Sequence, residues 1–227
     1  MISVIIPVYD ELDINSTLTE IYKQNYHNLE IIVVDGQEDC STIKLIENEN
    51  CIKLQSKPGR AIQMNAGARI ANGDVLLFLH ADCILQENGL KMIDQIIKSG
   101  FNAGAFNIWF ESRNFILREI ISRTSSLRGR LTRFPYGDQG QFFKKEYFEE
   151  IGGYTEMPLM EDIEIMQRIK QQKDKIFIIP QNMRTSARRW EEEGLFYVIF
   201  RNPILSILFF FGVTAEKLSR FYPRAKK

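Results

Sequence analysis

Short apolar runs alternate with amphipathic stretches along the first hundred residues. Runs rich in branched aliphatic side chains predict four strands, at residues 2–6, 30–36, 51–55 and 73–82. Apolar side chains at helical spacing predict four helices, at residues 10–24, 41–50, 59–71 and 88–100. Aspartates 10 and 13 and Ser41 are the candidate N-caps of the first two helices. This alternation predicts an α/β fold, with a mostly parallel, Rossmann-like sheet flanked by helices.

The second half of the chain has a less regular pattern. Two further strands are predicted at residues 103–111 and 175–180, and two helices at residues 144–154 and 160–172. An arginine-rich helical segment and a loop rich in glycine, proline and aromatic residues (134–143) separate them. We find no internal repeat and no flexible linker, so residues 1–190 are predicted to form one domain.

Residues 191–227 are predicted to form a hydrophobic helical tail with a basic end. The stretch 194–213 is long enough to cross a bilayer, but Arg201, Asn202 and Pro203 interrupt it. Three positions for this stretch therefore stay open: packing on the domain or on a partner, a place in the membrane interface, and a true membrane span. The basic residues that follow favour the interface: Lys217, Arg220, Arg224, Lys226 and Lys227.

Charge and cysteine content narrow the function classes. Basic and acidic residues both number 29, so the net charge gives no indication of nucleic-acid binding, and none is predicted. Six arginines lie near a single acid, Glu119, and suit either a solvated helix face or a surface for phosphates or lipid head groups. They are Arg113, Arg118, Arg123, Arg128, Arg130 and Arg133.

Three scattered cysteines without C-x-x-C spacing predict reduced, structural thiols. The first residues lack the basic start of a signal peptide. A cytoplasmic location is therefore expected, with the inner face of the cell membrane as the site suggested by the tail.

Acidic residues follow the predicted strands at three places. Asp35 ends one strand, Asp82 ends another, and Glu161 and Asp162 open a helix. Open α/β sheets bind ligands beyond the carboxyl ends of their strands, which makes these acids candidate site residues. Each also has a structural alternative, because such acids cap helices or stabilise their first turn.

The chain carries a series of motifs that resembles the family 2 glycosyltransferases, which have the GT-A fold. The motifs are "VIIPVYDE", "IIVVDG", "GRAIQMNAGARIANGDVLLFLHADC", "PYGDQGQFF", "GGYTEMPLMEDIEIMQRIK" and "SARRW". They run in order from residue 2 to about residue 190, and they are most similar to a bacterial subfamily with a His-Ala-Asp metal motif. The resemblance implies transfer of a sugar from a nucleotide-diphosphate sugar to a hydroxyl acceptor.

The resemblance also implies which residues hold the donor. The nucleoside pocket would be lined by Pro7, Tyr9, Glu11 and Asp35. Arg60 would contact the diphosphate, because a guanidinium fits phosphate oxygens. Asn65 would bond the ribose or the phosphates, with a surface helix position as its alternative.

The metal and the catalytic base come from the same resemblance. Asp82 matches the last residue of a D-x-D motif and would bind a divalent ion, Mn²⁺ or Mg²⁺. His80 replaces the first aspartate, and an imidazole suits manganese better than magnesium; the alternative is a hydrogen bond near the ribose. Asp162 matches the general base of an inverting transfer, and Glu161 would shape the loop.

The remaining candidates concern the acceptor and the diphosphate. Gln139 and Gln141 would bond an acceptor hydroxyl or else face water. Arg189 and Trp190 match part of the Q-x-x-R-W motif, and Arg189 would hold the diphosphate or stack on Trp190. Ser186 replaces the glutamine of that motif, which favours a single transfer over processive synthesis.

The tail and the arginines suggest a lipid-like or membrane-held acceptor. Two other function classes stay open: a nucleotidyltransferase acting on sugar phosphates, and a non-catalytic sugar-nucleotide-binding or membrane scaffold. The acidic, glycine-free segment after the first strand counts against the nucleotidyltransferase, which needs a basic glycine-rich loop there.

Overall fold

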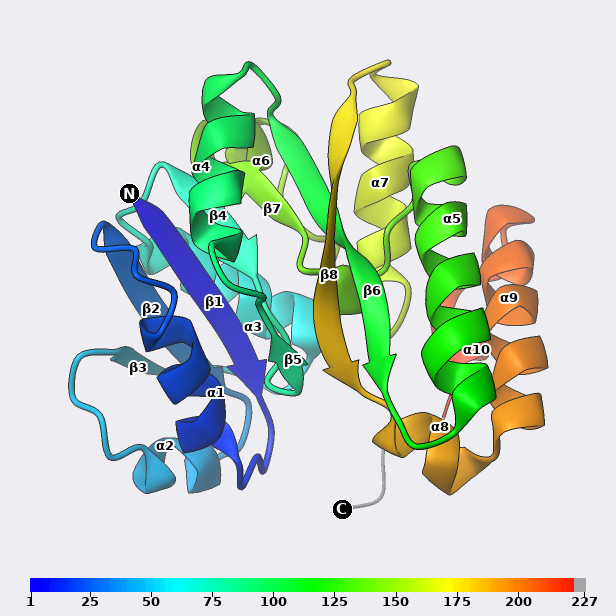
Figure 1. Cartoon of the computed structure of the whole chain (residues 1–227), viewed down its shortest axis with the longest axis horizontal. Coiled ribbons are helices and arrows are strands. Elements are labelled where there is room, and N and C mark those ends of the chain that lie inside the picture. The colour runs from blue at the N-terminus through cyan, green and yellow to red at the C-terminus, as the bar shows by residue number, and fades with distance from the viewer. Residues whose placement is uncertain (223–227) are drawn as a thin grey trace.

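A mixed sheet forms the centre of the molecule (Figure 1). The computed structural model describes residues 1–222. The strands are β1 (Ile2–Val8), β2 (Leu29–Asp35), β3 (Ile52–Gln55), β4 (Val75–Phe78), β5 (Cys83–Ile84), β6 (Ala103–Glu111), β7 (Phe142–Lys144) and β8 (Ile176–Ser186). Their order across the sheet is β3-β2-β1-β4-β7-β6-β8-β5.

The sheet is parallel in its first half and mixed in its second. Strands β3, β2, β1 and β4 pair in parallel, as the alternating pattern predicts. Strand β7 pairs antiparallel with both β4 and β6, and β5 pairs antiparallel with β8. Strands β6 and β8 pair in parallel again, so the sheet is mostly parallel, as predicted, with antiparallel pairings at β7 and β5. The short β7 follows a loop rather than a crossover helix, which allows antiparallel pairing.

Helices cover both faces of the sheet. On one face α1 (Ile14–Tyr22) and α4 (Gly89–Lys98) pack on the strands, and on the other α3 (Arg60–Ile70), α6 (Lys145–Glu150) and α7 (Glu161–Gln171) do so. Neighbouring residues of β1 and β2 enter opposite cores; for example Val4 and Ile6 enter one and Ile5 the other. Both faces are buried, which explains the near-continuous apolar runs of these strands.

Three predicted elements have different bounds in the structure. Helix α1 begins after Asp13, whose backbone caps it without a side-chain bond within the described residues. Helix α2 (Ser41–Leu45) is shorter than predicted, and Ser41 does not cap it. Strand β8 continues past Pro180 to Ser186, because a register shift between Phe106 and Asn107 accommodates the irregular stretch.

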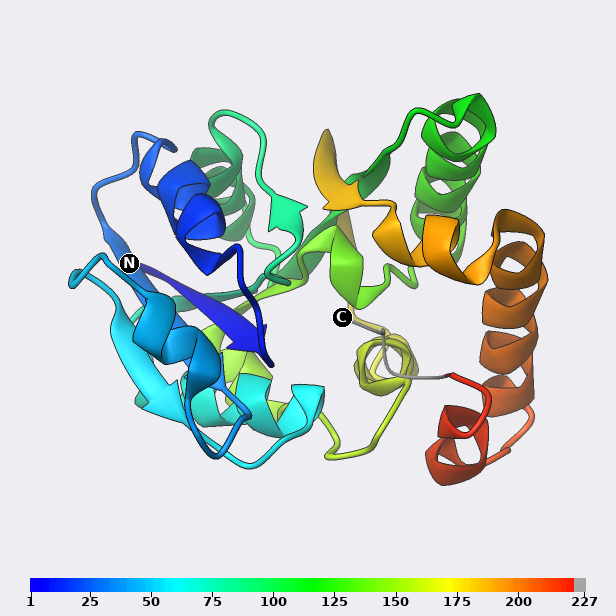
Figure 2. The same cartoon turned by 90° about the horizontal axis from the view of Figure 1, so that it is seen from below.

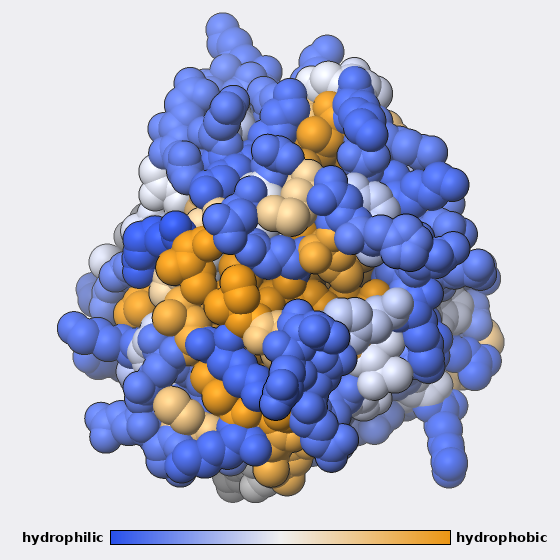
Figure 3. All heavy atoms as spheres, turned by 90° about the vertical axis from the view of Figure 1, so that its left-hand side faces the viewer, coloured by the Kyte–Doolittle hydropathy of each residue, from blue (hydrophilic) through white to orange (hydrophobic). Residues whose placement is uncertain are grey.

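One edge of the sheet is open to solvent. Strand β3 is the terminal strand on that side, and Figure 3 views the molecule from there. Apolar side chains gather in the middle of this face between hydrophilic ones. Ile52 of β3 and Leu45 of α2 are among the exposed apolar residues.

The arginine-rich segment and the tail form a second helical layer beside the sheet. A π-helix, Ile116–Ile121, continues into α5 (Ser122–Thr132), and the tail consists of α8 (Arg188–Glu193), α9 (Leu195–Phe210) and α10 (Ala215–Ser219). Figures 1 and 2 both place α9 beside α5 at one end of the molecule.

The tail packs back on the domain. Leu205 of α9 and Leu218 of α10 share a buried cluster with Leu159, Met160 and Ile163, which surround the start of α7. Packing on the domain is thus the alternative that the structure shows. Among the described residues no helix is long and apolar enough to cross a membrane. Of the basic residues after the tail, Arg224, Lys226 and Lys227 lie outside the described residues.

Candidate active site

The candidate metal ligands and the candidate base lie around one cavity of about 520 Å³. His80 and Asp82 follow β4, and Asp162 lies in the first turn of α7. Thr17 of α1 donates a hydrogen bond of 2.5 Å to the carbonyl of Ala81 and fixes the turn between them. Residues separated by eighty positions in the sequence therefore line the same space, because β4 ends there and α7 begins there.

The carboxylate of Asp162 is oriented by backbone groups. Its Oδ2 accepts a 2.7 Å hydrogen bond from the N–H of Gly137, and its Oδ1 accepts one of 2.9 Å from the N–H of Ile163. A Cβ at position 137 would lie 3.0 Å from Nε2 of His80, so a glycine lets the backbone approach both side chains. The short helix Gly137–Gln139 thereby positions Asp162 beside His80.

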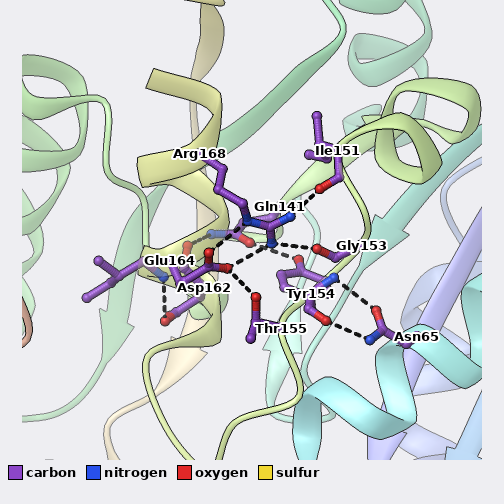
Figure 4. A network of polar contacts seen from close by, with 10 residues as sticks. Asn65, Gln141, Ile151, Gly153, Tyr154, Thr155, Asp162, Glu164 and Arg168 are labelled. Carbon is purple, nitrogen blue, oxygen red and sulfur yellow. Dashed lines mark hydrogen bonds and ion pairs between the residues drawn. The ribbon is translucent and has the colours of Figure 1, made fainter. Parts of the chain in front are cut away.

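A network of polar contacts holds the start of α7 (Figure 4). Gln141 donates to the carbonyl of Asp162 at 3.1 Å and accepts from the hydroxyl of Tyr154 at 2.8 Å. Asn65 of α3 bonds both backbone groups of Tyr154, at 2.8 and 3.0 Å. Arg168 joins Glu164 to the carbonyls of residues 151 and 153. The side-chain amide of Asn65 is thus used within the protein, and this position is half-buried rather than on the surface.

The two glutamines differ from their prediction. Gln139 and Gln141 are both 0% exposed, so the alternative that they face water is wrong. Gln139 donates to the carbonyl of Phe106 at 2.7 Å and accepts from the N–H of Tyr136 at 3.0 Å. Their amides hold the loop around residue 138, and Gln139 belongs to the lining of the cavity.

Arg60 and Glu161 form an ion pair between α3 and α7. Glu161 is 1% exposed, and burial raises its pKa while the charge of Arg60 opposes the rise. Burial alone would lower the pKa of Arg60, but the charges of Glu161 and Asp162 outweigh it and raise that pKa. The guanidinium stays charged, lines the cavity and retains other N–H donors for a phosphate.

His80 is neutral at physiological pH. Burial, and then the positive charges of Arg60 and Arg189, lower its pKa to about 3. A neutral imidazole has a free nitrogen lone pair and can bind a metal ion. Ligand atoms of His80, Asp82 and Cys83 lie within 4.8 Å of one another.

Asp82 and Cys83 differ as ligands. The side chain of Asp82 is exposed to solvent inside the cavity, but protein atoms surround the cavity at this point. This protein environment is the main cause that raises the pKa of Asp82, and the negative charge of Glu11 raises it further. A cation beside it would restore the charged form. Burial holds the pKa of the Cys83 thiol well above its usual range, and the thiol contacts Thr185 Oγ1 at 3.4 Å. A protonated thiol is a poor ligand for hard cations.

Asp138 is a cavity residue that the sequence analysis did not single out. Its Oδ1 is buried and, among the described residues, has no hydrogen-bond partner. Burial and the charges of Asp162 and then Asp82 raise its pKa to about 7, although Arg128 opposes the rise. An unpartnered carboxylate oxygen near Asp82 fits a nearby cation, so the residues present suit a divalent metal ion. In the sequence Asp138 lies in the loop "GDQG" and has no distinctive spacing that would have singled it out.

The predicted nucleoside residues lie outside this cavity. Within residues 1–222, the lining does not include Pro7, Tyr9, Glu11 or Asp35. They are at the carboxyl ends of β1 and β2, and β1 lies between β2 and β4 in the sheet. Tyr9 is 44% exposed, as a residue available to a ligand must be.

Asp35 acts as a helix cap in the structure. Its carboxylate is fully buried and accepts hydrogen bonds from the N–H groups of Gln37, Thr42 and Ile43 at 2.9, 3.0 and 3.2 Å. The capping alternative is therefore the one observed. In this arrangement its carboxylate stabilises the loop and α2 next to the nucleoside region.

Arg189 and Trp190 both line the cavity. The guanidinium of Arg189 lies 4.7 Å from the ring centre of Tyr222, and Arg201 approaches the same ring at 4.5 Å. Trp190 packs edge-on against Phe110. The predicted stack of Arg189 is thus observed on Tyr222 rather than on Trp190.

Comparison with known proteins identifies the class. The family model described as glycosyl transferase family 2 matches residues 3–154, and the chain belongs to this family. An uncharacterized glycosyltransferase of Haemophilus influenzae is 27% identical over 188 residues, covering 76% of this chain and 63% of that protein. The chain thus spans less than two thirds of that relative.

A second relative has a named reaction. The UDP-Glc:alpha-D-GlcNAc-diphosphoundecaprenol beta-1,3-glucosyltransferase WfgD of Escherichia coli is 28% identical over 129 residues, which cover 54% of this chain and 51% of that protein.

Two solved structures have the same fold. Residues 1–349 of TarS from S. aureus, in complex with UDP, match with a TM-score of 0.67 and 16% identity, covering 82% of this chain and 60% of that one. The mannosyltransferase PcManGT from Pyrobaculum calidifontis, with GDP-Man and Mn²⁺, matches with a TM-score of 0.60 and 19% identity, covering 82% and 56%. The chain therefore has the GT-A fold expected from its motifs.

Proposed function

We propose that this protein transfers a single sugar from a nucleotide-diphosphate sugar to an acceptor hydroxyl, with inversion at the anomeric carbon. The observation that carries the proposal is the placement of Asp162, oriented by Gly137 and beside His80 in one cavity. A base, a candidate metal site and two arginines thus surround the same space.

The proposed step is one displacement. The acceptor oxygen forms a bond to the anomeric carbon, and its proton passes to the carboxylate of Asp162. The bond between that carbon and the phosphate oxygen breaks, and its electron pair stays on the departing diphosphate. Arg60 and Arg189 supply positive charge to this leaving group. A single displacement inverts the configuration.

A divalent ion held by His80 and Asp82 would offset charge on the diphosphate when bound. A solved neighbour contains Mn²⁺, and the imidazole in this donor set also favours manganese. The nucleoside would lie at the carboxyl ends of β1 and β2, against Pro7, Tyr9 and Glu11, in the loop region that Asp35 stabilises. Asn65 and Glu161 would support this site through their contacts with Tyr154 and Arg60.

The first experiment is a calorimetric titration with UDP, GDP, ADP and dTDP, with and without Mn²⁺. We expect one diphosphate to bind, and to bind more tightly with the metal. Binding that ignores Mn²⁺ would contradict the metal site, and binding of none of the four would contradict the transferase assignment in favour of the scaffold alternative.

We also propose that the acceptor is lipid-like and that the protein works at the inner face of the cell membrane. The relative WfgD has a diphosphoundecaprenol acceptor in its name. Exposed apolar side chains of the tail suit contact with a membrane surface, and the basic residues Lys217 and Arg220 follow them in the sequence. The exposed apolar residues are Phe196, Phe200, Ile204, Ile207 and Phe211.

Replacing Phe196, Phe200 and Phe211 with serine should abolish binding to vesicles that contain phosphatidylglycerol. These rings are 73%, 64% and 84% exposed, so their loss removes apolar contact without opening the core. Flotation with vesicles measures the binding, and phosphatidylcholine vesicles control for lipid charge. Unmodified protein that stays at the bottom of both gradients would refute peripheral membrane contact.

A further inference from the structure

Tyr222 reaches the catalytic cavity from the end of the tail. Helix α10 folds back against α9 (Figure 2), and Leu218 of α10 is buried in the cluster at the start of α7. The turn continues past α10, because the N–H of Tyr222 donates to the carbonyl of Ser219 at 3.1 Å. Tyr222 packs on the same cluster and lines the cavity together with Arg60 and Arg189. The tail therefore brings an aromatic ring to the two arginines proposed for the diphosphate.

The ring of Tyr222 contacts two guanidinium groups. The Cζ atom of Arg189 lies 4.7 Å from the ring centre, and that of Arg201 lies 4.5 Å from it. Both distances are within the range of cation–π attraction, which is stronger where the groups are removed from water. This attraction comes from the ring and not from the hydroxyl, so a phenylalanine at position 222 would preserve it.

The two arginines differ in how firmly the protein holds them. The side chain of Arg201 is 4% exposed, forms an ion pair with Glu193 and lies 5.0 Å from the ring centre of Tyr197. The side chain of Arg189 is 33% exposed, and its Nε lies 3.9 Å from the carboxylate of Glu193, which is beyond hydrogen-bond distance. Arg201 is thus fixed, and the ring of Tyr222 rests on it and limits the positions that Arg189 can take.

These contacts leave the N–H groups of Arg189 available to a ligand. A cation–π contact uses none of them in a hydrogen bond, and their fork matches the oxygens of a phosphate. Immobilising a long side chain on binding lowers affinity, and a side chain that is already held avoids much of this cost. The ring of Tyr222 is therefore placed to keep Arg189 ready for a diphosphate.

We propose that Tyr222 is a positioning residue for the donor, whose ring holds Arg189 in the orientation that binds the diphosphate. The inference rests on the proposed function, in which Arg189 contacts the leaving group, and it makes the last turn of the tail part of the donor site. Arg201 then acts as the buried support of the ring. The competing explanation is that Tyr222 only fills the apolar cluster at the start of α7.

The test is calorimetric titration of UDP, GDP, ADP and dTDP into the full chain with Tyr222→Leu or Tyr222→Phe. Leucine keeps apolar packing but has no ring, so the Kd of the diphosphate that the unmodified protein binds should rise about tenfold. Phenylalanine keeps the ring and should leave this Kd unchanged. Phe221→Leu, at the exposed neighbouring position, is the matched control and should also leave it unchanged.

A double-mutant cycle shows whether the effect passes through Arg189, whatever the change in melting temperature. In an Arg189→Gln background Tyr222→Leu should not weaken diphosphate binding further, because the side chain that it positions is absent. Arg60 still lines the cavity in this background and keeps the affinity measurable.

Three results would overturn the inference: unchanged affinity in Tyr222→Leu, an equal loss in Tyr222→Phe, or a loss that persists in the Arg189→Gln background. In each of these cases the unmodified protein still binds a diphosphate, and the proposed function stands. If the unmodified protein binds none of the four diphosphates, the proposed function itself fails, and the inference fails with it.

Discussion

Asp162→Asn should lower sugar transfer by about 10²–10⁴-fold while leaving nucleotide binding unchanged. The substitution removes the atom that accepts the acceptor proton but keeps the size of the side chain. The amide oxygen can still accept the N–H of Gly137, which now donates to the carboxylate at 2.7 Å. Initial rates of nucleotide release with saturating acceptor measure the loss, and calorimetry measures nucleotide binding.

Asp74→Asn provides the matched control for this change. Asp74 pairs with the amino terminus at the surface, with an 86% exposed side chain far from the cavity. Its transfer rate should equal that of the unmodified protein. If Asp162→Asn transferred sugar at a normal rate with an unchanged melting temperature, Asp162 would not be the base.

The alternating pattern predicted the first half of the fold well for a physical reason. A strand buried on both faces needs a continuous apolar run, and β1, β2 and β4 each have one. Their helices need one apolar stripe, which the spacing shows directly. The bounds of α2 and β8 were less predictable, because Asp35 and a register shift in β6 decide them from elsewhere in the chain.

The candidate site could be predicted only in part from the sequence, for a related reason. A polar residue in a loop is usually expected to face water, but Gln139 pairs with the carbonyl of Phe106 on a strand distant in sequence. Asp35 fits both a ligand contact and a helix cap, and only its bonds to Thr42 and Ile43 decide between them. Asp138 has no distinctive spacing, and its role depends on burial beside Asp162.

The tail shows most clearly which contacts the sequence does not predict. An apolar segment with a basic end is typical of a membrane-interface helix, and its outer face keeps that character. The sequence does not show that Leu205 and Leu218 bury themselves against Met160 and Ile163, which adjoin the proposed base. The tail therefore packs against the start of α7 and contributes to the lining of the cavity, whatever its outer face contacts.

Asp82→Ala should remove the manganese-dependent part of nucleotide-diphosphate binding and lower transfer by more than about a hundredfold. A divalent ion contributes several kcal/mol to stabilising a departing phosphate, and Asp82 is the proposed carboxylate ligand. Calorimetric titration with and without Mn²⁺ measures the coupling, and the electron paramagnetic resonance signal of free Mn²⁺ measures the metal affinity without turnover.

Cys83→Ser is the informative control, because this neighbour belongs to the same cluster of possible ligand atoms. Burial keeps its thiol protonated, so a serine that retains the contact with Thr185 should leave manganese affinity unchanged. The opposite pattern, with affinity lost in Cys83→Ser and kept in Asp82→Ala, would move the metal to a thiolate. It would also favour a softer ion than Mn²⁺ or Mg²⁺, since thiolates select soft cations.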